Sequence, residues 1–358
     1  MVVALRALRG REPARSEVIV PAYTCPLVAL TVKLAPGLAV IPCDTLPGGF
    51  DFDPDRLASL CGPQTLVIAP THLGGRAADV ATAKAIAAHH GAAVLEDAAQ
   101  ALGATSAGKS VGLAGDAGFF SLAAGKGLTT YEGGILCAAD PVLRAELEAA
   151  ARGLLKPNAY WSTRRIIELL GYAALYRPSC MGLAYGRKLR RMLDKGDEEK
   201  AVGDYFTLAD IPLHSMDGFR RRVAANAIER LPEFLADAAA RAEKRIAALH
   251  ELEGVRVIAE PADRPGDKGV WPFLMVLMPG LKQRDKALSL LWRSGLGVSK
   301  LFVRALPDYP FLASCFEGRR FECPNARDLA DRMLTVSNSH WLGDGDFARI
   351  VTILKECL

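Results

Sequence analysis

The segment FSLAAGKGLTTYEGG, from Phe120 to Gly134, places a single lysine in a loop of small residues directly after an apolar run. A lysine among alanines and glycines can be kept from water, which lowers its pKa and leaves a neutral, nucleophilic amine. On an exposed loop the same side chain would be an ordinary solvated charge. The role of Lys126 therefore depends on the fold that carries this loop.

The N-terminal half of the chain alternates between strand and helix patterns. Helical periods are found at Pro54 to Leu60, Ala77 to His89 and Pro141 to Arg152. Short apolar runs lie around them, at residues 17–22, 38–43, 66–70, 92–98, 117–122 and 133–138. Strands that are apolar throughout and separated by helices indicate a parallel sheet covered on both faces. The pattern predicts an α/β fold with a mostly parallel sheet.

The C-terminal part has a different pattern. A long helical period from Arg221, with apolar residues along one stripe, is suited to link two domains. It is followed by an apolar strand (residues 270–278), a helix (282–295), a short strand near Val298, and helices at Asn325 to Met333 and Phe347 to Cys357. We predict a large α/β domain over residues 1–230, with an insertion at about 155–200, and a smaller α+β domain over residues 231–358.

Composition excludes several classes of function. The formal net charge of +4 is the difference between 44 basic and 40 acidic residues that are spread along the chain, so nucleic-acid binding is not indicated. The eight cysteines form no CxxC pair and suggest neither a zinc site nor a disulfide framework. No uncharged apolar run reaches the roughly 18 residues of a membrane span. We expect a cytoplasmic protein with reduced thiols and no metal.

Asp97 and Lys126 are the two candidate catalytic groups. Asp97 ends one apolar strand and Lys126 follows another, and ligands of parallel α/β sheets bind beyond the carboxyl ends of the strands. A buried carboxylate next to a desolvated lysine suits pyridoxal phosphate, because the acid keeps the pyridine nitrogen protonated while the amine binds the cofactor carbonyl. Alternatively, the aspartate caps a helix and the lysine is solvated.

Four longer segments carry a specific resemblance. VIVPAYTC (18–25), APTHLGGRAAD (69–79), the stretch 96–134 and CPNARDLADRMLTVSNSHW (323–341) together resemble the DegT/DnrJ/EryC1/StrS family of sugar aminotransferases. These enzymes have the aspartate aminotransferase fold, fold type I of the pyridoxal phosphate enzymes. The resemblance runs along the chain except near residues 160–200.

The resemblance implies roles for individual residues. Lys126 matches the lysine that binds the cofactor covalently and moves the proton, and Asp97 matches the partner of the pyridine nitrogen. Gln100 matches a residue near the phenolic oxygen of the ring, and Ser121 matches a serine that reaches the cofactor phosphate. For His72, a catalytic role and a structural role remain open, whereas Glu132 with Gly133 and Gly134 suggests turn chemistry.

The resemblance also implies a reaction and an assembly. Because the lysine is kept and not replaced by histidine, as it is in the family's dehydratases, transamination is expected. L-glutamate would donate an amino group to pyridoxal phosphate, and a nucleotide-linked keto sugar would accept it. The family forms homodimers, so a homodimer is expected. A lyase acting on an amino acid would fit Asp97 and Lys126 equally well, but not the other motifs.

Three positions depart from the family pattern. The turn that cradles the cofactor phosphate would lie just ahead of Met1, so the family's N-terminal segment is expected to be missing. Cys25 stands where an aromatic ring usually stacks on the cofactor. Arg220, in GFRRR (218–222), stands where an asparagine reaches the phosphate of the partner subunit's cofactor, and an arginine can bind that phosphate too. The alternative is a non-catalytic homologue that acts as a partner or regulator.

The expected insertion joins an apolar run to a basic one. Residues 169–185 contain several leucines and tyrosines, and Arg187, Lys188, Arg190 and Arg191 follow them. Such a composition is compatible with an amphipathic surface lying on anionic lipid. A dimer arm or a lid over the active site is the favoured interpretation.

Overall fold

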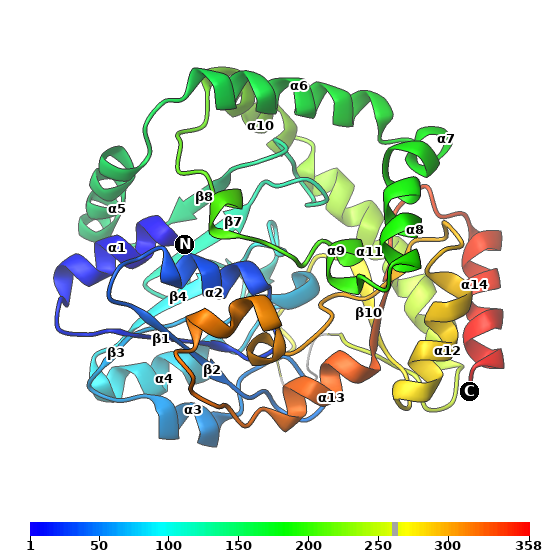
Figure 1. Cartoon of the computed structure of the whole chain (residues 1–358), viewed down its shortest axis with the longest axis horizontal. Helices are drawn as coiled ribbons and strands as arrows, with labels where there is room; N and C mark the ends of the chain where they lie inside the picture. Colours follow the sequence, from blue (N-terminus) through cyan, green and yellow to red (C-terminus); the bar gives the residue numbers. More distant parts are fainter. Residues whose placement is uncertain (260–263) are drawn as a thin grey trace.

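The computed structural model describes residues 1–259 and 264–358, in which two sheets are the main supports of the fold (Figure 1). The larger, six-stranded sheet has the order β2-β1-β3-β4-β7-β8. Its strands are β1 (Glu17–Pro21), β2 (Ala39–Cys43), β3 (Thr65–Ile68), β4 (Ala93–Asp97), β7 (Ala117–Ser121) and β8 (Gly134–Cys137). All neighbouring pairs are parallel except β7 and β8. Each strand coincides with one of the apolar runs in the sequence.

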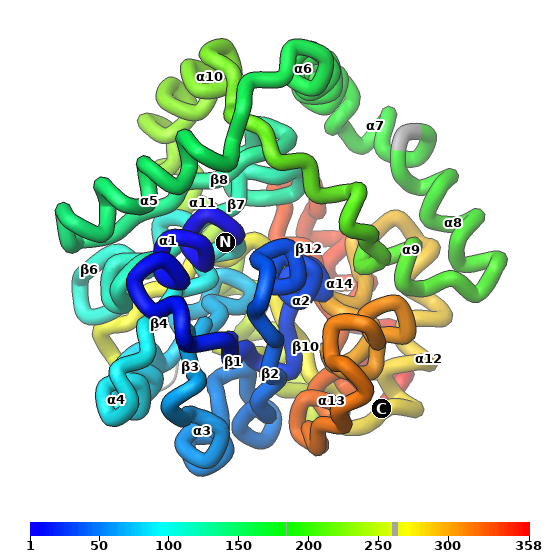
Figure 2. Tube along the Cα trace, turned by 60° about the vertical axis from the view of Figure 1, so that its left-hand side comes forward, coloured from blue at the N-terminus to red at the C-terminus, as the bar shows by residue number. Residues whose placement is uncertain are grey.

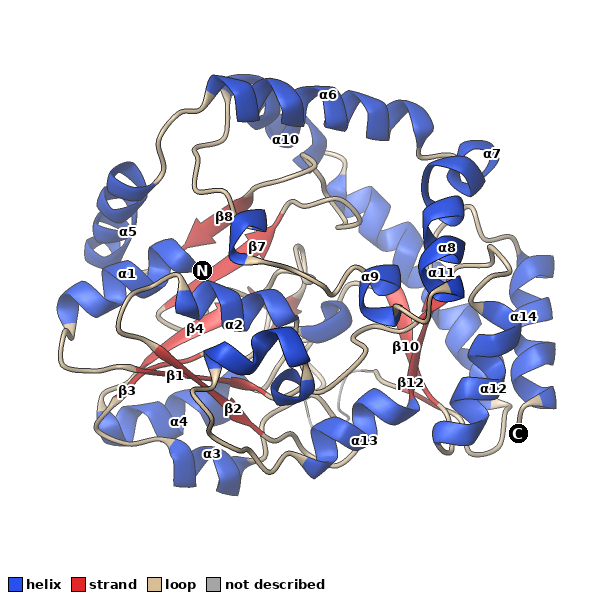
Figure 3. Cartoon of the chain, in the orientation of Figure 1, coloured by secondary structure: helices blue, strands red, loops and turns tan. Residues whose placement is uncertain are grey.

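Helices cover both faces of the six-stranded sheet, as the continuously apolar strands require (Figure 3). One face packs against α1 (Val2–Arg11), α2 (Pro26–Lys33) and α5 (Pro141–Leu154). The other face packs against α3 (Pro54–Leu60) and α4 (Val80–His90). Helix α4 begins three residues later than the sequence pattern suggested, because the Asp79 side chain accepts the Thr82 amide hydrogen bond and caps it there.

The smaller sheet has four strands in the order β11-β12-β10-β9 and is antiparallel. Its strands are β9 (Arg256–Val257), β10 (Phe273–Leu277), β11 (Val298–Ser299) and β12 (Met333–Ser337). Around it lie α11 (Leu231–His250), α12 (Leu281–Leu291), α13 (Pro324–Arg332) and α14 (Asp344–Glu356). Strand β12 was not predicted from the sequence, which placed Met333 at the end of a helix. The expected α/β fold with a smaller C-terminal α+β part is confirmed.

A series of helices connects the two sheets across one side of the molecule. It contains α6 (Ala159–Leu175), α7 (Pro178–Met181), a π-helical turn (Gly182–Gly186), α8 (Arg187–Asp194), α9 (Glu198–Val202) and α10 (Gly218–Ile228). Figures 1 and 2 show α6 and α7 running from the side of α5 toward α8, which lies beside the small sheet. The basic helix α8 buries its apolar residues Leu189, Met192 and Leu193 against the C-terminal core. This contact suits a lid better than a lipid-facing surface.

Between β4 and β7 the chain forms a short hairpin of β5 (Thr105–Ser106) and β6 (Lys109–Ser110). No helix within residues 1–259 and 264–358 is long and apolar enough to cross a membrane.

Candidate active site

Asp97 and Lys126 lie at the same edge of the large sheet. Strands β4 and β7 are parallel neighbours, and Asp97 pairs with Phe119 in their register. Asp97 is the last residue of β4 and only 6% exposed, and Lys126 lies in the loop after β7. The carboxylate and the amine therefore both lie beyond the carboxyl ends of two adjacent strands, close enough to influence each other's pKa, and their roles remain predictions.

Burial and mutual attraction determine the charges of this pair. Burial raises the pKa of Asp97, and the Ala99 N–H, which donates to its Oδ1 at 3.0 Å, together with the charge of Lys126 opposes that rise. Burial also lowers the pKa of Lys126, and the charges of Cys25 and Asp97 oppose that fall. A further cationic or N–H partner, such as a protonated pyridine nitrogen, would stabilise the ionised form of a buried aspartate.

Gln100 and Ser121 lie at the same edge as Lys126. These three residues, with Ala99 and Gly127, line one side of a cavity of about 30 Å³. The Gly74 N–H donates to the Gln100 side-chain oxygen at 2.7 Å, and the Ala123 N–H donates to Ser121 Oγ at 3.2 Å, so both side chains are held in place. The opposite wall comes from α11 and from residues 270–272.

The chemistry of these residues fits pyridoxal phosphate, although the cavity itself is small. An amine with a lowered pKa, a buried acid, a hydroxyl and the small side chain of Ala99 are the groups that this cofactor requires. The cavity has room for only a water or two. Alone, this cavity is too small for the ring of the cofactor.

The start of α1 lies beside this site. Burial lowers the pKa of the Met1 amino group to about 6, and the charge of Asp97 opposes the change. Helix α1 begins at Val2, next to the position just ahead of Met1 where the resemblance placed the turn that cradles the cofactor phosphate. Cys25, expected near the ring, is close enough to affect Lys126, and burial raises the pKa of its thiol to about 12. The thiol is therefore unreactive at neutral pH.

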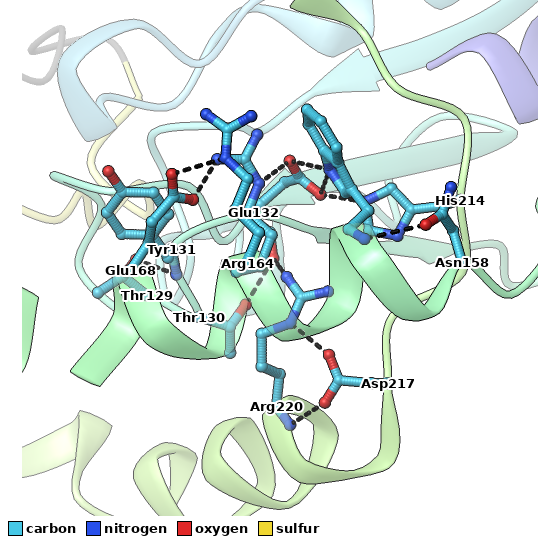
Figure 4. Close-up of polar contacts among 12 residues, drawn as sticks. Thr129, Thr130, Tyr131, Glu132, Asn158, Arg164, Glu168, His214, Asp217 and Arg220 are labelled. Carbon is cyan, nitrogen blue, oxygen red and sulfur yellow. Dashed lines mark hydrogen bonds and ion pairs between the residues drawn. The ribbon is translucent and has the colours of Figure 1, made fainter. Parts of the chain in front are cut away.

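Arg220 does not line the cavity that contains Lys126. Its side chain is 1% exposed and lies at the start of α10, where Nε donates to Asp217 Oδ2 at 2.6 Å and Nη1 donates to the Glu132 carbonyl at 3.1 Å (Figure 4). Within the described residues its Nη2 has no hydrogen-bond partner. The expected contact with a partner subunit's phosphate remains a prediction, for which this nitrogen is the available donor.

His72 has a structural role in this chain. Its Nδ1 accepts a hydrogen bond from the Ala78 N–H at 2.9 Å, which leaves the hydrogen on Nε2, and Nε2 donates to Glu96 Oε2 at 2.9 Å. The ring is completely buried, and both nitrogens are occupied. Of the two roles left open by the sequence, the structure favours the structural one.

Glu132 holds the loop that carries Lys126, a role that the sequence interpretation as turn chemistry did not foresee. His214 Nε2 lies 2.5 Å from its Oε1, Arg165 Nε lies 2.5 Å from its Oε2, and Trp161 Nε1 donates to it at 3.1 Å (Figure 4). These partners come from α6 and from the segment before α10. One carboxylate thus ties the end of the lysine loop to two elements distant in sequence.

Helix α6 touches the lysine loop at two further points. The rings of Tyr131 and Tyr172 meet edge to face, with centroids 6.2 Å apart. Burial raises the pKa of Tyr172, and the nearby backbone of Gly125 opposes that rise. Gly125 directly precedes Lys126. Tyr131 has a φ of 68°, an uncommon conformation for a residue other than glycine. The contacts with α6 therefore help to maintain the shape of the loop on both sides of Lys126.

We expect Glu132→Gln to loosen this loop. The substitution keeps the size of the side chain but removes the charge that attracts Arg165 and His214. Because Glu132 is a quarter exposed, the loss of unfolding free energy should be only about 1 kcal/mol, whereas affinity for pyridoxal phosphate should fall several-fold. Urea unfolding and cofactor titration measure the two effects. Glu148→Gln, which removes an exposed ion pair with Arg152 on α5, is the control and should leave cofactor affinity unchanged.

The fold and these residues can be compared with known proteins. The model of the DegT/DnrJ/EryC1/StrS aminotransferase family matches residues 1–174 and 214–355. The chain belongs to this family. The match begins at residue 1, so it gives no support to the expectation of a missing family segment. Residues 175–213, which include α7, α8 and α9, lie outside the match.

Individual relatives match over shorter segments. The GDP-perosamine synthase of Caulobacter vibrioides is 37% identical over 192 residues, which are 53% of this chain and 50% of that protein. The L-glutamine:2-deoxy-scyllo-inosose aminotransferase of Streptomyces kanamyceticus is 39% identical over 137 residues, 38% of this chain and 31% of that protein. The chain thus spans half or less of the length of these curated relatives.

Solved structures support the fold. The putative sugar aminotransferase Spr1654 of Streptococcus pneumoniae, in its PMP form, superposes with a TM-score of 0.74 at 18% identity, over 99% of this chain and 85% of that one. The same protein is also known in its PLP form. At this level of identity the likeness shows a shared fold and no more.

Proposed function

We propose that this chain is a pyridoxal phosphate-dependent aminotransferase that moves an amino group from L-glutamate to a nucleotide-linked keto sugar. The observation that carries the proposal is the position of Asp97 and Lys126 at the ends of adjacent parallel strands, in a member of an aminotransferase family. The proposed product would enter a polysaccharide or a glycosylated metabolite.

Each site residue has its own role in the proposed reaction. Bound pyridoxal phosphate would supply an electron sink for the carbon that carries the amino group. Lys126 would hold the cofactor carbonyl covalently and, once displaced, carry the proton between carbon atoms, a task for which its lowered pKa suits it. Asp97 would keep the ring nitrogen protonated. Gln100 would bond near the phenolic oxygen, and Ser121 would bond the phosphate.

The assembly belongs to the same proposal. A homodimer would place Arg220 near the partner subunit's cofactor phosphate, since arginine binds phosphate by charge and by paired hydrogen bonds. We further propose a cytoplasmic location and a division into domains at residues 230 and 231, with the large sheet before that point and the small sheet after it.

The non-catalytic alternative has support of its own. The cavity beside Lys126 measures only about 30 Å³, and the Arg220 side chain is already paired with Asp217 in its own chain. Both observations fit a homologue that keeps the fold but no longer binds the cofactor and acts as a partner or regulator.

An absorbance spectrum decides between the two. The purified chain with added pyridoxal phosphate should show a protein-bound visible band that differs from that of the free cofactor, and L-glutamate should bleach it. Because one relative is named for L-glutamine, L-glutamine should be tested in parallel. Bleaching by L-glutamine alone would reject the proposed donor and keep the transaminase. A spectrum of free cofactor only would favour the non-catalytic homologue.

A further inference from the structure

A cavity of about 690 Å³ lies between the helices of residues 176–190 and the small sheet. Its lining residues come from α7 and α8 and, facing them, from β10, β12 and α14, which are labelled in Figure 3. Its volume is within the range of small-molecule sites, about 300–1,000 Å³. It is far larger than the cavity beside Lys126.

One wall of this cavity lies in the part of the chain that the family model does not match. That wall runs from Tyr176 through α7 and the π-helical turn to Arg190, within the unmatched residues 175–213. The facing wall, which includes Phe273, Trp292 and Thr335, lies in matched sequence. The cavity is therefore formed by adding a chain-specific wall to a family surface.

The charged groups of the cavity favour an anion. Arg177, Arg190 and Arg293 contribute positive charge, and Asp346 is the acidic residue among the lining residues that the structure describes. Arg293 is paired with Asp194 at 2.5 Å, and Arg190 Nη2 lies 3.5 Å from the Gly182 carbonyl. The charge of two arginines thus remains to attract phosphate oxygens, which the guanidinium fork binds well.

The uncharged groups favour a planar ring. Tyr185 and Trp341 line the cavity with about half of their surface exposed, and the Trp341 ring packs against that of His340, with centroids 4.4 Å apart. Trp292 also lines it, is 7% exposed, and its indole N–H has no hydrogen-bond partner within the described residues. Exposed rings stack on a base, and the buried indole supplies a donor for it or for a phosphate.

The cavity is next to the proposed active site. Pro272, at the start of β10, lines both the large cavity and the small one that contains Lys126. The two cavities are therefore adjacent at this residue.

We propose that the large cavity binds the nucleoside diphosphate portion of the amino acceptor, with the base between the aromatic side chains and the diphosphate on Arg177 and Arg190. The proposal rests on the proposed function. It assigns the chain-specific segment 175–194 to recognition of the acceptor.

Binding of UDP, GDP and dTDP without any sugar tests this site. Titration of the whole chain, followed by tryptophan fluorescence and calorimetry, should show binding of at least one nucleoside diphosphate. The double variant Arg177→Glu with Arg190→Glu should weaken that binding about 10-fold or more. The control is Arg187→Glu with Arg191→Glu, which makes the same charge change on the exposed side of α8 outside the cavity, and it should bind as the wild type does.

Inorganic pyrophosphate separates the two halves of the ligand. Trp341→Ala should weaken the nucleoside diphosphate several-fold and leave pyrophosphate unchanged. Absence of binding by all three nucleotides at millimolar concentration, or equal losses in the two arginine pairs, would overturn the proposal. Bleaching by an amino donor, measured on the same preparation, reports the proposed function separately, because that half-reaction needs no nucleotide.

Discussion

Lys126→Ala should abolish the visible band of bound pyridoxal phosphate and lower amino transfer by about 1,000-fold or more. The amine both binds the cofactor carbonyl and carries the proton, and proton transfer by a placed side chain alone is worth about 100- to 10,000-fold. Burial lowers the pKa of Lys126, which favours the neutral, nucleophilic form of the amine. Spectra with and without L-glutamate, and single-turnover rates, measure both losses.

Lys109→Ala is the matched control for this variant. Lys109 lies in strand β6 and is exposed, so its removal should change neither the band nor the rate. A Lys126→Ala protein that retains the band and the rate would show that the lysine is not the nucleophile. Equal losses in both variants would show that the loss of a positive charge, and not the loss of a nucleophile, causes the effect.

The strands of the large sheet could be predicted because they are buried on both faces. Uninterrupted apolar runs of this length, separated by helical patterns, are typical of such strands. The apolar pattern could not predict that β8 is antiparallel, because the direction of this strand depends on the hairpin formed by the lysine loop. Strand β12 was missed because it follows α13 with no intervening loop and because Thr335 and Ser337 interrupt its apolar pattern.

The candidate site also has features that the sequence could predict and features that it could not. Asp97 and Lys126 could be placed together because parallel strands end at one edge of a sheet. The partners of Glu132 could not, since His214, Arg165 and Trp161 reach it only after α6 and the segment before α10 have packed on the loop. Nor could the sequence show that Arg220 pairs with Asp217 or that His72 supports a buried carboxylate.

That carboxylate belongs to Glu96, which is completely buried and lies next to Asp97 in β4. The N–H groups of Gly112, Ala114 and Gly115 donate to it at 2.7, 2.7 and 2.6 Å, in addition to the bond from His72. Burial by itself would raise the pKa of Glu96, but the hydrogen bonds from His72 and from the backbone donors outweigh it and lower the pKa. Glu96 thus joins the loop before β7 to the segment that contains His72.

We expect Glu96→Gln to lower the free energy of unfolding by about 3 kcal/mol or more. An amide NH₂ would face backbone N–H donors, which leaves buried donors unpaired in a site built for a carboxylate. Urea unfolding followed by circular dichroism measures the loss. The control is Glu146→Gln, which removes a half-exposed ion pair with Arg11 and should cost less than about 1 kcal/mol.

The contribution of Glu96 to the free energy of unfolding should decrease as the pH falls. Because the pKa of this carboxyl is lower in the folded than in the unfolded chain, its contribution is complete above the unfolded value of about 4.5 and is lost as pH falls toward the folded value. The stability difference between wild type and Glu96→Gln should therefore be constant from pH 6 to 8 and shrink below about pH 4.5. A difference that grew on acidification would mean that the folded protein holds Glu96 protonated. In that case the network of amide donors would not be what stabilises the edge of the sheet next to Asp97.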